Sequence, residues 1–237
     1  MKKVGAGSLV DTELFSELPV DEIGELAKRC VWRRYDKDEQ VVDRSSESRD
    51  VFLVVEGRVV VVNYSSTGRE ISFANVRPGG YFGELSAIDG EPRSATVNVA
   101  EDCLLAAISP RLFKDILSRY PTVAEHVMRR LARIIRICDE RIMDLSTLGA
   151  VQRVYLELLR LAKEEDIAAA TWVIYPMPTQ AQIASRASTT RETVARVIGQ
   201  LAQEDLVARK GRSLYLRDRD TLAARAERMT PHQDVVA

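Results

Sequence analysis

The segment FGELSAIDGEPRSATV, residues 82–97, holds an acid and an arginine nine residues apart among glycines and small side chains. Glu84 follows Gly83, and Arg93 precedes two small residues. A guanidinium is permanently charged and presents a fork of donors to phosphate oxygens, whereas a carboxylate accepts hydrogen bonds from hydroxyls. Glycine lets the backbone approach a ligand closely. The pattern favours a site for a small anionic ligand with hydroxyls. The alternative is a structural Glu84–Arg93 ion pair that closes a turn.

A second segment, residues 180–198, combines an apolar pattern with exposed charge. The apolar positions fit two short helices that cross at a steep angle, with a small residue, Ala184, allowing close approach. They are Ile183, Ala184, Val194, Val197 and Ile198. Thr190 is expected in the N-cap region of the second helix. Arg191, Glu192 and Arg196 then lie on the outer face of that helix.

Those three side chains suit base edges in DNA. Arginine can bind guanine O6 and N7 with both arms, and glutamate can accept from cytosine N4. A hairpin predicted at 209–215 adds Lys210 and Arg212, which suit phosphates. Residues 179–216 hold six basic and three acidic residues, in a chain whose net charge is −1. This asymmetry favours DNA binding over the alternative, an ordinary helical hairpin with a solvated charged face.

The remaining composition excludes several classes of function. Cys30, Cys103 and Cys138 lie far apart, and only two histidines occur. This argues against zinc, iron–sulfur and haem sites and against a disulfide scaffold. No nucleophile–base constellation appears, so we do not expect an enzyme. Without a signal peptide or an apolar run long enough for a membrane, a reduced, cytoplasmic protein is expected.

The elements that must position these residues follow from hydrophobic periodicity. Residues 12–30 carry apolar residues at helical spacing, and about 32–108 reads as short strands of a sandwich or barrel. Within that region we expect a strand, Gly57, a second strand, a Ser-Ser-Thr-Gly turn and a third strand. Residues 150–164 read as an amphipathic helix, and the tail after Met229 as unstructured.

Between these regions lies a heptad pattern with three repeats. Its apolar positions alternate in steps of four and three: Ala124, Met128, Leu131, Ile135, Cys138, Ile142 and Leu145. We call these seven positions the seam. Such a pattern favours a helix that dimerises with a second copy. The alternative is one helix packed on its own domain.

Together these motifs resemble the CRP/FNR superfamily of bacterial transcription regulators, in particular its cyclic-AMP receptor branch, over nearly the whole chain. The resemblance implies an α+β fold in three parts. They are an N-terminal β-roll (jelly-roll-like) cyclic-nucleotide-binding domain over 1–119, a dimerisation helix and hinge over 120–148, and a C-terminal winged helix-turn-helix domain over 149–237.

The resemblance also implies roles for single residues. Arg93 matches the arginine that pairs with the cyclic phosphate, and Glu84 matches the acid that accepts from the ribose 2′-hydroxyl. The full ligand set is Val61, Phe73, Gly83, Glu84, Leu85, Ser86, Arg93, Ser94, Ala95, Cys138 and Asp139. Gly83 and Leu85 supply backbone N–H groups, and Ser94 a further donor. The expected DNA-binding residues are Thr179, Gln180, Thr190, Arg191, Glu192, Arg196, Lys210 and Arg212.

Two departures from the family pattern bear on function. Cys138-Asp139 stands where cyclic-AMP receptors carry a Thr-Ser pair that contacts adenine. A carboxylate only accepts hydrogen bonds, so Asp139 matches the two donors of guanine better. The alternative is a seam cysteine beside a solvated acid. Ser188 stands in the helix-turn-helix turn where glycine is usual, which predicts a slightly strained turn.

The expected function is a homodimeric regulator that binds cyclic AMP, cyclic GMP or both, uses no metal and recognises a palindromic, TGTGA-like site. The expected partners are double-stranded DNA, a second copy and RNA polymerase, with no membrane. Two alternatives stay open: a regulator of this fold with another ligand or none, and a cyclic-nucleotide-binding regulatory subunit of another protein, such as a kinase.

Overall fold

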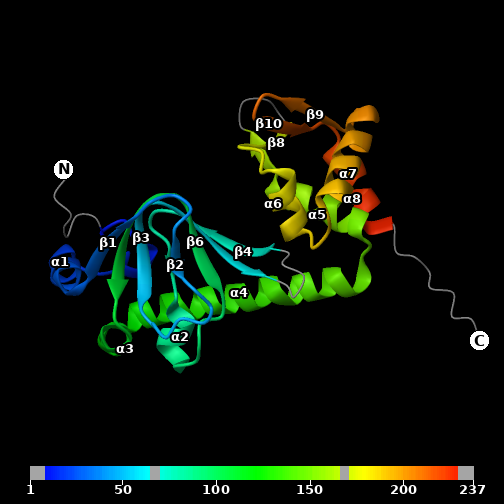
Figure 1. Ribbon diagram of the computed structural model, residues 1–237. Helices are drawn as coiled ribbons and strands as arrows, with labels where there is room; N and C mark the ends of the chain where they lie inside the picture. The colour runs from blue at the N-terminus through cyan, green and yellow to red at the C-terminus, as the bar shows by residue number, and fades with distance from the viewer. Residues whose placement is uncertain (1–8, 65–69, 166–170, 229–237) are drawn as a thin grey trace, which may run out of the picture. The chain divides into compact units, whose positions relative to one another are not determined.

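The computed structural model describes residues 9–64, 70–165 and 171–228. The chain divides into two compact units, residues 1–135 and 136–237, and each is described by itself (Figure 1). The predicted Ser-Ser-Thr-Gly turn and the tail after Met229 lie outside the described residues.

The first unit is built on an antiparallel sheet. Its strands are β1 (Val31–Tyr35), β2 (Gln40–Val42), β3 (Val51–Tyr64), β4 (Glu70–Val76), β5 (Tyr81–Phe82) and β6 (Thr96–Ile108). The order is β1-β6-β3-β4, with β2 paired to β6 and β5 to β3. Helical elements are η2 (Glu13–Phe15), α1 (Val20–Arg29), α2 (Glu84–Asp89), α3 (Pro110–Arg119) and α4 (Pro121–Thr147).

The first four residues of β3, Val51–Val54, are buried on both faces, and their alternation separates two cores. Val51 and Leu53 join a cluster with residues of α1, α3 and α4. Phe52 and Val54 join a second cluster made of strand residues inside the roll. Because successive side chains of a strand point to opposite faces, one apolar run serves both cores. The predicted α+β class is confirmed.

Gly57 does not end a strand, contrary to the prediction. It lies at φ +80° within the continuous β3, where the pairing with β6 shifts register. A Cβ there would lie 2.0 Å from the Asp102 carbonyl oxygen, so only glycine fits this β-bulge. The glycine that suggested a turn instead marks a place where two strands approach closely.

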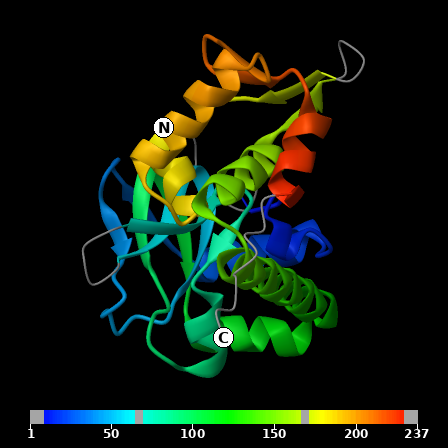
Figure 2. The same ribbon diagram turned by 90° about the vertical axis from the view of Figure 1, so that its right-hand side faces the viewer.

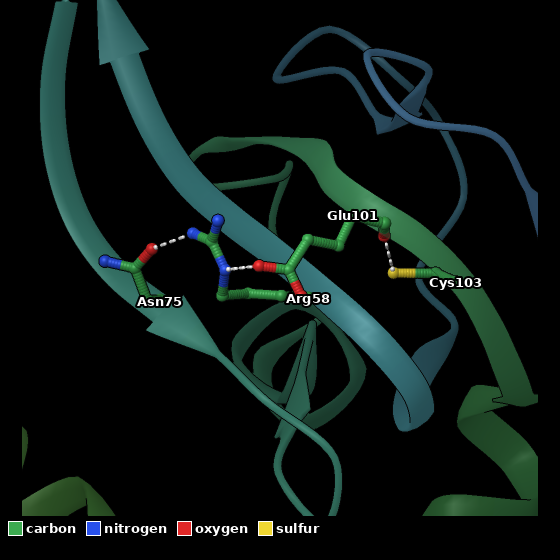
Figure 3. A network of polar contacts seen from close by, with 4 residues as sticks. All are labelled: Arg58, Asn75, Glu101 and Cys103. Atoms are coloured by element: carbon green, nitrogen blue, oxygen red, sulfur yellow. Dashed lines mark hydrogen bonds and ion pairs between the residues drawn. The ribbon is translucent and has the colours of Figure 1, made fainter. Parts of the chain in front are cut away.

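Beside the bulge, Arg58 joins three strands (Figure 3). Its Nε donates to Glu101 on β6 at 2.9 Å, and its Nη1 donates to Asn75 on β4 at 3.0 Å. The Cys103 thiol donates to the Glu101 carbonyl oxygen at 2.9 Å. This network holds β4 and β6 against β3.

The helix predicted over 12–30 is interrupted. The chain forms the short 3₁₀ turn η2, and α1 begins only at Val20. Pro19 occupies the N-cap of α1, because proline lacks an N–H and tolerates the start of a helix but not its interior. Periodicity alone did not show this break.

Helix α4 has two kinds of apolar residue. Val123 and Val127 are buried in the core of the first unit. Three seam residues, Met128, Ile135 and Ile142, are each 60–61% exposed. The alternative of a helix packed on its own domain therefore describes the first turns of α4, whereas most of the seam is left uncovered. The helix ends at Thr147, just before the predicted hinge.

In the described part of the second unit, the helices that follow α4 pack on a small antiparallel sheet. The elements are α5 (Ala150–Leu161), β7 (Lys163–Glu165), β8 (Thr171–Ile174), α6 (Gln180–Arg186), α7 (Arg191–Gln203), β9 (Val207–Lys210), β10 (Ser213–Leu216) and α8 (Arg219–Arg228). The sheet order is β7-β8-β10-β9. Helix α8 lies against α5, as the red and yellow-green helices of Figure 2 show.

Two features of this unit were not expected. The helix predicted over 150–164 ends at Leu161, because residues 163–165 pair with β8 and strand pairing overrides their helix propensity. Glu157, a buried acid on α5, lies 3.4 Å from Arg186 on α6. Burial raises the pKa of Glu157, while Arg186 opposes the rise.

Candidate functional site

The cassette that carries Glu84 and Arg93 begins with a backbone turn that only glycine adopts easily. Gly83 lies at φ +88° between β5 and the short helix α2. A Cβ there would lie 2.6 Å from the Asp50 carbonyl oxygen and 2.7 Å from Nη1 of Arg93. The sequence pattern predicted strand and turn in this region, and α2 was not expected. The first N–H groups of α2 have no acceptor within the helix.

Arg93 is only 4% exposed and is held by the first unit itself. Nη1 donates to the Gly83 carbonyl oxygen at 3.1 Å. Nη2 donates to the Asp50 carbonyl oxygen at 2.8 Å and to Ser48 Oγ at 3.3 Å. Nε is buried and has no acceptor.

The structural ion pair weighed as an alternative is not formed. Glu84 is 6% exposed, and both Glu84 and Arg93 are described, yet no ion pair joins them. Burial lowers the pKa of Arg93, and the carboxylates of Asp50 and Glu84 act against this. Guanidinium groups titrate so far above neutral pH that Arg93 keeps its charge. A buried cation with an unused donor fits a phosphate oxygen.

The other expected ligand residues of the first unit lie around this cassette. Ser86 is buried, and its Oγ donates to the Pro92 carbonyl oxygen at 3.3 Å. Ser94 is exposed, and its carbonyl oxygen accepts from Asn63 on β3 at 3.0 Å. Ala95 is half-buried, and Leu85 is exposed on α2.

Val61 and Phe73 stand on the two strands beside the cassette. Val61 pairs with Val97 of β6 on one side and with Ala74 of β4 on the other. Phe73 lies at the register shift of β4 and is exposed. The sheet therefore brings an apolar strip next to the segment that carries Arg93. Cys138 and Asp139 are exposed on the part of α4 that belongs to the second unit.

Sequence reasoning missed the residues that hold Arg93. Ser48 and Asp50 lie in the loop before β3, more than forty residues away in the chain. Arg49 of the same loop donates to the carbonyl oxygen of Gly90, which ends α2. No local pattern announces such contacts, because strand pairing alone brings this loop to the cassette.

The two helices predicted around residue 188 are α6 and α7. Ile183, Ala184, Val194 and Val197 are buried between them, as predicted. The hydroxyl of Thr179 caps α6 and that of Thr190 caps α7, by accepting from Gln182 N and Thr193 N. Ser188 lies in the connecting turn at φ +49°, which confirms the strained turn.

The exposed face of α7 carries the charged residues that suit DNA. Arg191, Glu192 and Arg196 are all exposed. Hydrogen bonds from its own backbone N–H and from the Thr190 hydroxyl lower the pKa of Glu192. Its carboxylate is therefore an acceptor at neutral pH, which is the state that a cytosine amino group requires.

The predicted hairpin is β9–β10, with Gly211 and Arg212 between the strands. Lys210 and Arg212 are exposed, as is Thr179, while Gln180 is half-buried. Over the described part of the chain, no three His, Cys, Asp or Glu side chains are grouped to hold a metal ion. Among those same residues, no helix is long and apolar enough to cross a membrane.

Comparisons with known proteins match both units. Residues 32–120 match the family described as "Cyclic nucleotide-binding domain", and residues 152–225 match "Crp-like helix-turn-helix domain". The cyclic AMP receptor protein of Thermus thermophilus is 31% identical over 195 residues, 82% of this chain and 87% of that protein. The cAMP-activated global transcriptional regulator CRP of Salmonella typhimurium is 24% identical over 188 residues, 79% of this chain and 90% of that protein.

Among solved structures, a CooA mutant from Carboxydothermus hydrogenoformans shares the fold with a TM-score of 0.74. At 21% identity, it covers 85% of this chain and 90% of its own.

Proposed function

Because the chain belongs to the CRP/FNR family of cyclic-nucleotide-binding transcription regulators, we propose that a cyclic purine nucleotide controls how tightly its homodimer binds a two-fold-symmetric DNA site. The observation that carries the proposal is the buried guanidinium of Arg93, which has an unpartnered Nε and whose Nη1 donates to the Gly83 carbonyl oxygen.

The ligand side of the proposal rests on charge. Arg93 binds the cyclic phosphate, helped by backbone N–H groups at the start of α2 and by Ser94. Glu84 accepts from the ribose 2′-hydroxyl, and Val61 and Phe73 lie along the apolar part of the nucleotide. Cyclic AMP is the first candidate, because a receptor named for it is 31% identical to this chain. Cyclic GMP is the second, because Asp139 offers only acceptors to the base.

The DNA side rests on α7 and the hairpin. Arg191 and Arg196 contact guanines, and Glu192 accepts from a cytosine. Lys210 and Arg212 bind phosphates and set the position of the unit on the duplex. A dimer places its two recognition helices in successive major grooves, about 34 Å apart, on an inverted repeat of TGTGA-like half-sites.

Dimerisation through the seam explains why α4 leaves large apolar side chains uncovered. Met128, Ile135 and Ile142 are exposed at heptad positions, which a second copy of the helix would cover. Sedimentation at micromolar concentration should give a dimer mass for the wild type and a monomer mass for Ile135→Glu.

RNA polymerase is the further protein partner we propose, on the family resemblance alone.

The decisive test is a gel-shift titration with two duplexes, one with the inverted repeat and one scrambled. Cyclic AMP should tighten binding to the repeat far more than to the scrambled duplex. Equal retention of both duplexes, with and without nucleotide, would contradict the proposal. Direct titration with cyclic AMP and cyclic GMP tests the first open alternative, because a regulator with another ligand or none would bind neither nucleotide. The gel shift tests the second, because a regulatory subunit of another protein would not prefer the inverted repeat.

A further inference from the structure

Arg130 of α4 makes three contacts that the proposed function does not use. Its Nη2 donates to the Tyr81 carbonyl oxygen at 2.7 Å, and its guanidinium carbon lies 4.0 Å from the centre of the Tyr81 ring. Its Nη1 lies 3.8 Å from Oε2 of Glu13. The side chain is only 23% exposed. One residue of α4 is thus bound at once to β5 and to the N-terminal turn η2.

Tyr81 connects this contact to the cassette. It is fully buried on β5, pairs with Leu53 of β3 and lies two residues before Gly83. The preceding Gly79 carbonyl oxygen accepts from the N–H of Glu13 at 2.8 Å, so η2 and the start of β5 are already joined. A shift of the backbone at Gly83 therefore reaches the carbonyl group that Arg130 holds.

The kind of contact matters for transmission. Val123 and Val127 also hold α4 to the first unit, but apolar contacts have no preferred direction and allow a helix to slide. A guanidinium that donates to a carbonyl and lies over an aromatic ring has one favourable geometry. Arg130 therefore makes the position of α4 depend on the position of β5.

We propose that Arg130 is a positioning residue that couples nucleotide binding in the cassette to the placement of α4, and through α4 to DNA affinity. The inference rests on the proposed function and names the residue through which its regulation passes. The bound nucleotide contacts the Gly83 backbone and Glu84. These contacts shift the end of β5, and the guanidinium of Arg130 shifts with it. A ligand acts only through its different affinities for two arrangements, so losing this link lowers the coupling more than either affinity.

The test compares Arg130→Gln with a matched control on the neighbouring residue of the same helix. Arg129 is 71% exposed, and its ion pair with Glu125 lies within α4. For each full-length protein, calorimetry gives the affinity for cyclic AMP without DNA. Titration of the inverted-repeat duplex, with and without saturating cyclic AMP, gives the factor by which the nucleotide tightens DNA binding.

Arg130→Gln should lower that factor about tenfold or more, because a charge-assisted hydrogen bond and a stacked cation are both lost. Its affinity for cyclic AMP without DNA should change much less. Arg130→Lys keeps the charge but not the planar fork, so its factor should lie between those of the wild type and Arg130→Gln. Arg129→Gln should leave the factor unchanged, since Arg129 is exposed and its ion pair with Glu125 lies within α4.

A second readout does not depend on DNA. Cyclic AMP should change hydrogen exchange of the amides of residues 121–135 in the wild type and in Arg129→Gln, but not in Arg130→Gln. A melting temperature that falls in Arg130→Gln while both readouts stay at wild-type values would overturn the coupling role and leave a structural one. If the DNA affinity of the wild type is the same with and without the nucleotide, the proposed function fails. The exchange readout then decides the role of Arg130 by itself, and a wild type that binds no cyclic nucleotide overturns both.

Discussion

Arg93→Ala removes the buried cation on which the proposed ligand site depends. The side chain is 4% exposed, so solvent screens its interactions little. A charge-assisted hydrogen bond contributes about 1.5–3 kcal/mol. Arg93 has two N–H groups left, one on Nε and one on Nη1, so a phosphate contact through both contributes about 3–6 kcal/mol. The dissociation constant for cyclic AMP should rise by roughly two to four orders of magnitude. Glu84 contacts only a hydroxyl, so Glu84→Gln should cost about 1 kcal/mol of binding free energy, which raises the dissociation constant roughly fivefold.

The same substitution also perturbs the fold, which the assay must separate from binding. Without Arg93, the carbonyl oxygens of Gly83 and Asp50 lose their donors, at a cost of about 1–3 kcal/mol. Removal of a desolvated charge offsets part of this. Calorimetric titration should therefore run at a temperature where circular dichroism shows the variant folded. Arg34→Ala is the control, because Arg34 is exposed and pairs with Glu56 at 3.3 Å, away from the cassette.

An Arg93→Ala protein that stays folded and binds cyclic AMP as tightly as the wild type would refute the reasoning. The guanidinium would then serve only to tie the loop before β3 to α2. A Glu84→Gln variant that loses more affinity than Arg93→Ala would refute the ranking, because it would mean that the ribose contact outweighs the phosphate contact.

The remaining predictions address strain, selectivity, pH and DNA. Gly83→Ala should lower both the melting temperature and the affinity for cyclic AMP, because the left-handed backbone costs alanine about 1–2 kcal/mol before its Cβ meets its neighbours; wild-type values of both would be inconsistent with the cassette geometry. Asp139→Ser should shift the ratio of cyclic AMP to cyclic GMP dissociation constants toward cyclic AMP, and an unchanged ratio means that this side chain does not read the base. Glu157 has a pKa raised by burial, so its contribution to stability is complete below the unfolded pKa of about 4.3 and is lost as pH rises through the higher folded value. The melting temperature of Glu157→Gln should therefore rise relative to that of the wild type as the pH increases above about 4.3, and a pH-independent difference contradicts the raised pKa. Arg191→Ala should weaken binding about five- to hundredfold at one base position, whereas Lys210→Ala should weaken all duplexes similarly and flatten the salt dependence; identical profiles for the two variants would contradict their separate roles.

Much of the candidate site could be predicted because the signals are local. Gly83, Glu84 and Arg93 lie within eleven residues, and their types alone indicate a phosphate and a hydroxyl. Thr190 and the apolar pattern around it predicted the cap and the buried face of α7, and both are confirmed. Each of these features depends on the helical period or on residues that are neighbours in the chain.

Other expectations failed where the chain meets a distant segment. Gly57 was taken for the end of a strand, because a glycine in a strand pattern indicates a turn as readily as a bulge. The bulge lies where Gly57 faces the backbone of Asp102, forty-five residues later, whose carbonyl oxygen leaves no room for a Cβ. Lys163 was taken as helical, because its partner strand β8 begins only at Thr171 and the local pattern does not indicate the pairing.

The sequence by itself determined most of the helices and strands, the closeness of Gly83, Glu84 and Arg93 in the chain, and the charged face of α7, since residue type and spacing are enough to specify them. Only the tertiary structure decided what holds these groups in place. Ser48 and Asp50 reach Arg93, and Arg130 reaches Tyr81, across forty or more residues. The reason is physical: a buried polar group must find a partner, and the register of the sheet and the packing of α4 decide which distant group lies within reach.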